Sequence, residues 1–102
     1  MDYYFIGDPE LVTAFRFIGV EGTSVRDAEE ATEVFRQIAE ESGGCRVLIL
    51  TEEVADWVEE LVVEWELSGR YPLVVEIPGI MGKLPGRKTL VELIRQAIGV
   101  NV

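Results

Sequence analysis

Strand-length apolar runs alternate with amphipathic stretches along the whole chain, and this alternation restricts the fold more than any other feature of the sequence. The runs of strand length lie at residues 3–7, 19–25, 46–50 and 73–77. Apolar residues recur at helical spacing at residues 10–18, 28–39, 53–67 and 90–98. Four β-α units in succession predict an α/β protein with a parallel sheet and helices packed against it.

The expected sheet has four parallel strands in the order 2-1-3-4. Residues 3–7 and 46–50 are apolar on both faces, as central parallel strands are, whereas residues 19–25 are half polar and interrupted by glycine. A chain of 102 residues has room for one core. We therefore expect a single domain in which residues 1–78 form the parallel core and residues 79–102 form a basic loop and a C-terminal helix.

Five residues are predicted to begin or end helices. Asp8 is a good N-cap, and Pro9 suits the first helical position. Thr51 is placed to cap the helix that follows the third strand. Gly19 and Gly99 each follow a helical stretch, where glycine commonly terminates the helix.

The composition excludes several classes of function. The chain contains no histidine, which excludes Ser-His and Cys-His nucleophiles and histidine-ligated metals, and we expect no metal and no cofactor. The net charge of −10 makes nucleic acid and anionic lipid poor partners. No apolar run is long enough to insert into a membrane. The single Cys45, and a start unlike that of a signal peptide, favour a cytoplasmic location.

Ligands of an open parallel sheet bind beyond the carboxyl ends of its strands, and three sequence positions lie there. Asp8 could ligate a metal, but its place before Pro9 already explains it as a helix cap. Thr51 and Glu52 begin a helix in the same way. The glycine-rich basic loop at residues 79–88 could hold an anion on backbone amides, although its spacing does not match a phosphate-binding loop. We therefore predict no catalytic residue.

Two further features admit both a structural and a functional interpretation. The carboxylates of the second and third predicted helices lie on polar helical faces, and we interpret them as a solvated surface. Trp57 and Trp65 are eight residues apart on one side of their helix, which fits either the core or a protein interface.

Charge is divided unevenly along the chain. Residues 1–78 hold 18 acidic and 5 basic residues, net −13, whereas residues 79–102 are net +3. A basic end on an acidic body is a candidate docking element, although basic residues also occur at ordinary helix ends. The predicted partner-binding residues are Lys83, Arg87, Lys88 and Arg95, together with Arg16.

Five short blocks of sequence, in order, resemble the F subunit of the V-type and A-type rotary ATPases of archaea and bacteria. They are Gly7-Asp8-Pro9, Phe15-Arg16-Phe17-Ile18-Gly19-Val20, Leu48-Ile49-Leu50-Thr51-Glu52, Ile77-Pro78 and Arg95-Gln96-Ala97-Ile98-Gly99. Each block is weak alone, but together they extend over nearly the whole chain.

The resemblance implies a non-catalytic component of the central stalk in an ATP synthase or ATPase that couples ATP synthesis or hydrolysis to ion transport. Such a component binds the coiled-coil D subunit of the stalk, turns inside the A/B hexamer and lies in the cytoplasm, peripheral to the membrane. Two alternatives stay open at this point. One is a receiver-like docking module without phosphorylation chemistry, since the third strand ends in Thr51 and not in aspartate. The other is a small-anion-binding protein that uses the loop at residues 79–88.

Overall fold

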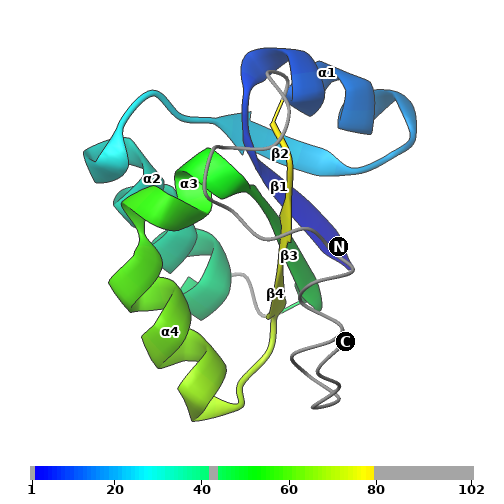
Figure 1. The fold of residues 1–102 in the computed structure, drawn as a ribbon. Coiled ribbons are helices and arrows are strands. Elements are labelled where there is room, and N and C mark those ends of the chain that lie inside the picture. The colour runs from blue at the N-terminus through cyan, green and yellow to red at the C-terminus, as the bar shows by residue number, and fades with distance from the viewer. Residues whose placement is uncertain (1, 42–43, 80–102) are drawn as a thin grey trace, which may run out of the picture.

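The computed structural model describes residues 2–41 and 44–79, which form one layered α/β unit (Figure 1). Its strands are β1 (Tyr3–Gly7), β2 (Glu21–Ser24), β3 (Val47–Thr51) and β4 (Leu73–Ile77). Its helices are α1 (Pro9–Phe17), α2 (Ala28–Arg36), which continues into a π-helical turn η1 (Gln37–Glu41), α3 (Glu52–Trp57) and α4 (Glu59–Ser68). The predicted C-terminal helix and its preceding loop lie outside the described residues.

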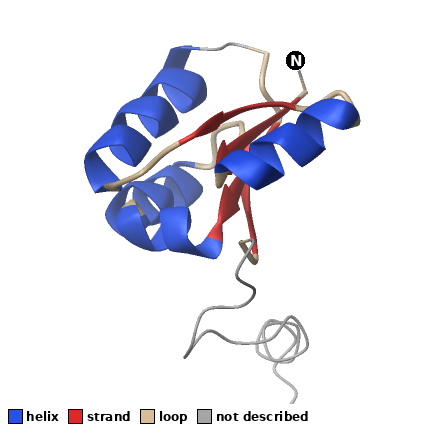
Figure 2. Ribbon diagram, turned by 90° about the horizontal axis from the view of Figure 1, so that it is seen from above, coloured by secondary structure: helices blue, strands red, loops and turns tan. Residues whose placement is uncertain are grey.

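The four strands are parallel and adopt the order β2-β1-β3-β4, which confirms the predicted fold class and topology. Residues in register across the sheet include Phe5 of β1, Gly22 of β2, Ile49 of β3 and Val75 of β4. Figure 2 shows α1 on one face of the sheet and α2, α3 and α4 on the other.

The main core lies between the sheet and the three helices α2, α3 and α4. Ile6, Leu48 and Leu50 are fully buried on that face, because alternate residues of a strand point to the same side. They pack with apolar residues of the helices, among them Ala31, Phe35, Val54, Val62 and Trp65. On the opposite face, the ring of Phe5 packs against Phe15 of α1 with 4.5 Å between the ring centroids.

The predicted helix ends can be checked at four positions. Pro9 is the first residue of α1, and Gly19 follows its end with a φ of +88°, where glycine is favoured. Thr51 precedes α3, and its Oγ1 accepts a hydrogen bond from the Val54 amide at 3.3 Å. Asp8 occupies the N-cap position of α1 with extended backbone, but its side chain makes no capping hydrogen bond. Gly99 lies outside the described residues.

The single helix predicted over residues 53–67 is wrong, because α3 and α4 are separate helices that meet at Val58. Val58 leaves helical geometry with φ −116° and ψ 28°. The hydrogen bonds on both sides of it persist, from Val58 N to Val54 O at 3.1 Å and from Val62 N to Val58 O at 2.9 Å. Val58 is also buried, so core packing and retained hydrogen bonds compensate for the bend. The helix predicted over residues 28–39 likewise ends early and becomes η1.

Candidate functional site

The carboxyl end of the sheet, where an open parallel sheet would bind a ligand, is closely packed. Thr51 is 1% exposed, and the Glu52 that follows it is also buried. The Asp8 carboxylate lies so close to Gly79 that a Cβ placed on this glycine would be 2.9 Å from Asp8 Oδ2 and 3.8 Å from Thr51 Cβ. The Asp8 side chain therefore lies against Gly79, two residues after the end of β4. Within residues 2–41 and 44–79, no three acidic, cysteine or histidine side chains are grouped to hold a metal ion.

Most of the predicted partner-binding residues cannot be placed. Lys83, Arg87, Lys88 and Arg95 lie outside the described residues, as does most of the loop considered for anion binding. Arg16 is exposed in the last turn of α1. The next two side chains are also exposed, Phe17 by 86% and Ile18 by 74%, although the helical spacing of apolar residues suggested that Ile18 is buried. Arg16 thus belongs to an exposed corner that combines a cation with two large apolar groups.

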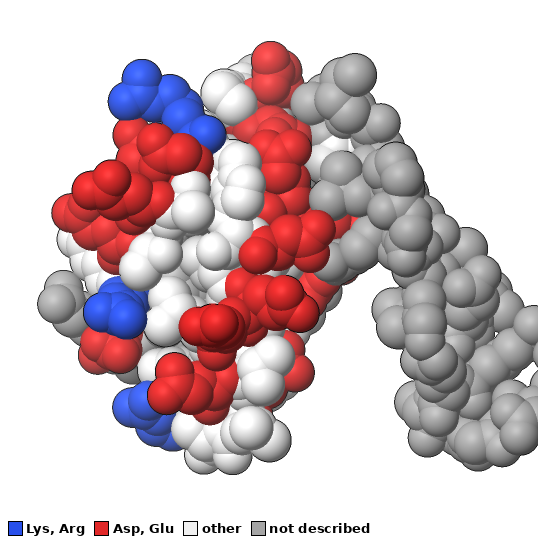
Figure 3. Space-filling view, turned by 60° about the vertical axis from the view of Figure 1, so that its left-hand side comes forward, with Lys and Arg blue, Asp and Glu red and all other residues white. Residues whose placement is uncertain are grey.

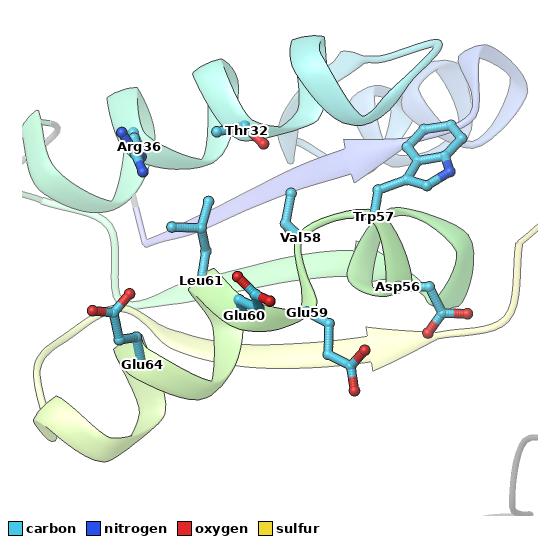
Figure 4. Close-up of a pocket in the computed structure, with 9 residues that line it drawn as sticks. All are labelled: Thr32, Arg36, Asp56, Trp57, Val58, Glu59, Glu60, Leu61 and Glu64. Atoms are coloured by element: carbon cyan, nitrogen blue, oxygen red, sulfur yellow. The ribbon is translucent and has the colours of Figure 1, made fainter.

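A groove with a volume of about 470 Å³ runs between α2 on one side and α3 and α4 on the other (Figure 4). Val58 and Leu61 point toward α2, and Thr32 and Arg36 of α2 also line the groove. The acidic residues of its lining come from the other wall and are Asp56, Glu59, Glu60 and Glu64. The groove is therefore an acidic, open depression with a partly apolar floor.

The helices on this side also set the charge of the surface. Together α2, α3 and α4 contain ten acidic residues and one basic residue, Arg36. In Figure 3 the acidic side chains form two bands that flank an uncharged strip on this side of the molecule. A surface of this charge repels phosphate groups, so it is suited to a protein partner or to solvent rather than to nucleic acid.

The two tryptophans have different environments. Trp65 is buried, its Nε1 donates a hydrogen bond to the Pro72 carbonyl at 2.9 Å, and its ring meets Phe35 edge to face. The guanidinium of Arg70 lies 4.2 Å from the centre of the Trp65 ring. Trp57 is half-buried and lines the groove. Trp65 is therefore a core residue, and Trp57 is the tryptophan that a partner could reach.

The titratable groups with shifted pKa values are explained by local structure. Burial raises the pKa of the Cys45 thiol, so this cysteine is not an activated nucleophile. A hydrogen bond from the Arg26 side chain, followed by one from its backbone amide, lowers the pKa of Glu30. Glu30 also takes part in the cap of α2, because its amide donates to Asp27 Oδ1 at 2.9 Å. Cys45 and Glu30 therefore have structural roles.

Comparison with known proteins identifies the family. Residues 4–95 match the family described as ATP synthase (F/14-kDa) subunit. The chain belongs to this family. Among its relatives is the F subunit of the A-type ATP synthase of Methanothermobacter thermautotrophicus, which is 36% identical over 95% of this chain and 92% of the relative. The F subunit of the V-type ATP synthase of Clostridium perfringens is 31% identical over 95% of this chain and 90% of its own length. The F subunit of the A-type ATP synthase of Methanocaldococcus jannaschii is 32% identical over 95% of this chain and 94% of its own length.

Membership of the ATP synthase F-subunit family agrees with the resemblance carried by the five sequence blocks. Three of them fall on structural positions that the fold needs: the β1–α1 turn at Gly7-Asp8-Pro9, the end of α1 at Gly19, and the β3–α3 junction at Thr51-Glu52.

None of the described helices has the length and apolar character needed to cross a bilayer.

Proposed function

We propose that this chain is a non-catalytic component of the central stalk of a V-type or A-type ATP synthase, where it binds the coiled-coil D subunit. The observation that carries the proposal is the family match over residues 4–95. In this role the chain transmits rotation between the ATP-hydrolysing or ATP-synthesising sites, which lie on other subunits, and the ion-transporting part of the complex. It lies in the cytoplasm and is attached to the membrane only through the complex.

The described surface supports a role in protein contacts. The corner formed by Arg16, Phe17 and Ile18 presents side-chain types that are enriched at interfaces, namely arginine and large apolar groups. Trp57 offers a second accessible aromatic group in the acidic groove. The A/B hexamer is the second partner that the proposal includes.

The proposal is tested by binding to the coiled-coil stalk protein of the same organism. The two chains are co-expressed with an affinity tag on the coiled coil, and the purified complex is sized by light scattering. A one-to-one complex is expected. Recovery of the coiled coil without this chain, when this chain is separately shown to be folded, would reject the stalk assignment.

We further propose that Arg16 and the basic residues after position 79 dock the domain on the coiled coil or the hexamer. The separation of the basic C-terminal residues from the acidic body supports this, because charge at an interface rim raises the association rate and makes it depend on salt. Arg87→Glu, Arg95→Glu and Arg16→Glu should each weaken binding, and added salt should reduce the difference from wild type.

A matched control is Arg46→Glu. Arg46 is an exposed arginine immediately before β3, 3.9 Å from a carboxylate oxygen of Asp2, and belongs to none of the proposed docking groups. Its reversal should leave binding unchanged. If the three test variants bind like wild type at low salt while the complex still forms, the basic residues have no docking role and the stalk assignment stands.

A further inference from the structure

The groove between α2 and the helices α3 and α4 has carboxylates along both of its sides. A second open depression, lined by α2 and the first residue of η1, shares Thr32 and Arg36 with the groove, so the two adjoin along α2. Their linings combine one guanidinium, that of Arg36, with six carboxylates. We call these six residues the acidic rim: Glu29, Glu33, Asp56, Glu59, Glu60 and Glu64.

The helix dipole explains only part of the acidic rim. Glu29, Glu59 and Glu60 lie in the first turns of α2 and α4, where negative charge is favoured. Glu33 and Glu64 lie beyond these turns, and each follows another rim glutamate by four residues on the same helix, a spacing at which like charges repel. Within residues 2–41 and 44–79, neither Glu33 nor Glu64 forms an ion pair, so the repulsion lacks a neutralising contact.

Apolar side chains lie between the two acidic sides. Trp57 and Leu61 are half-buried, Val58 is buried, and all three line the groove (Figure 4). The uncharged strip between two acidic bands in Figure 3 shows the same arrangement at the surface. Tryptophan is enriched among the residues that dominate binding energy at interfaces. This pattern is complementary to an amphipathic helix whose apolar stripe has lysine or arginine on both sides.

The length and the position of the groove also fit a helix from another protein. The nine residues of α2 extend about 14 Å and the ten residues of α4 about 15 Å, which is close to three turns of a bound helix. The groove lies on the sheet face opposite to α1 (Figure 2), whereas the exposed corner at Arg16, Phe17 and Ile18 lies at the end of α1. A protein at this corner and a helix in the groove therefore occupy different faces of the domain.

We propose that the groove binds a basic amphipathic helix of a second protein, different from the protein that the corner of α1 contacts. The apolar stripe of this helix packs on Trp57 and Leu61, and its lysine and arginine side chains lie against the acidic rim on both sides. Nucleic acid and anionic lipid are not suitable occupants, because the same carboxylates repel them. The inference goes beyond the proposed function and does not depend on it.

An NMR titration of the full chain with a designed peptide tests the proposal. The probe has about 14 residues, a length at which isolated helices become marginally stable, with leucine at every third or fourth position and lysine on both sides of the leucine stripe. The indole N–H signal of Trp57, assigned with Trp57→Phe, should shift more than that of Trp65, which is hydrogen-bonded to the Pro72 carbonyl.

A peptide of the same composition in scrambled order is the control for charge alone. It should bind about tenfold more weakly, because it lacks the apolar stripe. Equal affinity of the two peptides, or a titration that leaves the Trp57 signal unmoved, would overturn the proposal.

Matched variants distinguish the groove from the overall acidity of the chain. The double variant Glu60→Gln, Glu64→Gln removes two rim carboxylates and should weaken peptide binding by about threefold to tenfold, a difference that added salt should reduce. The control variant Glu53→Gln, Glu66→Gln removes the same charge from exposed positions of α3 and α4 outside the groove lining. It should weaken binding by less than about twofold. Equal weakening by the two double variants would reject the groove as the binding site.

Competition with the coiled-coil D subunit tests whether the occupant is a separate protein. A chain already bound to the coiled coil should take up the peptide with unchanged affinity. Displacement of the peptide by the coiled coil would show that both use the groove, and the proposal of a second protein would be wrong. Failure of the coiled coil to bind at all would count against the proposed function, whereas the peptide titration would still decide the role of the groove.

Discussion

Gly7 ends β1 within one of the blocks that carry the family resemblance, and the structure predicts that it cannot be replaced by alanine without loss of stability. A Cβ placed on Gly7 would lie 2.6 Å from Thr51 Cγ2 and 3.0 Å from Phe5 Cε2, and closer still to Phe5 Cζ. Carbon atoms that do not share a bond prefer separations of about 3.5–4.0 Å. Neither neighbour can move aside freely, because Phe5 and Thr51 are almost fully buried and the Phe5 ring packs on Phe15.

The expected cost follows from two opposing terms. Overpacking a rigid site costs about 1–3 kcal/mol, and contact on two sides places Gly7→Ala in the upper part of this range. Alanine lowers the conformational entropy of the unfolded chain relative to glycine, which stabilises the folded state by about 0.4–1 kcal/mol. The free energy of unfolding should therefore fall by about 1–2.5 kcal/mol, and the Tm by roughly 4–20 °C. Urea titration followed by tryptophan fluorescence measures this, with an unchanged m value.

A second substitution distinguishes the steric cause from others. Phe5→Leu removes the ring atoms that meet the new Cβ, so its cost and that of Gly7→Ala should add to more than the cost of the double variant. Gly69→Ala is the matched control. Gly69 has φ +69°, and no neighbouring group lies within 4 Å of its Cβ position. Gly69→Ala should therefore destabilise the fold only through backbone strain, and its effect on the free energy of unfolding should add to that of Phe5→Leu. The packing argument would be refuted if the effects of Gly7→Ala and Phe5→Leu on the free energy of unfolding were additive. A loss of less than about 0.5 kcal/mol in Gly7→Ala alone would also refute it.

Three further predictions concern single groups. Thr51→Ala should lower the free energy of unfolding by about 1–2 kcal/mol in a urea titration, because it removes the buried cap on the Val54 amide, and Thr51→Ser should recover most of the loss. Glu30→Gln should lower the Tm at pH 7. The folded pKa of Glu30 lies below its ordinary value of 4.5, so its contribution is complete above that value and disappears as the pH falls through the folded pKa. The two Tm values should therefore converge as the pH falls below the folded pKa of Glu30, and a difference that stays constant with pH would refute the Arg26–Glu30 assignment. Cys45 should react slowly with a disulfide reagent at about pH 8 in the folded chain and rapidly in denaturant, since burial both shields the thiol and raises its pKa; equal rates in the two states would contradict its burial.

The sheet could be predicted from sequence because its strands carry strong local signals. β4 begins and ends where the sequence indicated, at Leu73 and Ile77, between Pro72 and Pro78. The start of α1 at Pro9 and the N-cap of α3 at Thr51 could also be predicted, since particular side chains are favoured where a helix begins.

The features that escaped prediction have no local signal. The bend at Val58 contains neither glycine nor proline, and its neighbouring hydrogen bonds persist. The Asp8 side chain lies against Gly79, a residue 71 positions away in sequence. Exposure of Leu73 and Val75 was equally invisible, because an apolar run looks the same whether one or both of its faces are covered.

The sequence indicated some features of the described surface but not their environments. The charge division and the pair of tryptophans are visible in the sequence, but their spacing could not separate Trp57 from Trp65. That distinction depends on the Pro72 carbonyl and Phe35, which reach Trp65 only through tertiary packing. The exposed corner at Phe17 and Ile18 was missed because Ile18 continues the apolar pattern of α1.

The affinity of this chain for the coiled-coil D subunit of its own organism tests the central claim most directly. Isothermal titration of the purified chain into the isolated coiled coil should give saturable one-to-one binding, with heat released or absorbed on complex formation. Binding should weaken for Arg16→Glu and remain at the wild-type level for Arg46→Glu. Absence of binding by two properly folded proteins, both by calorimetry and by co-purification, would contradict the assignment to the central stalk.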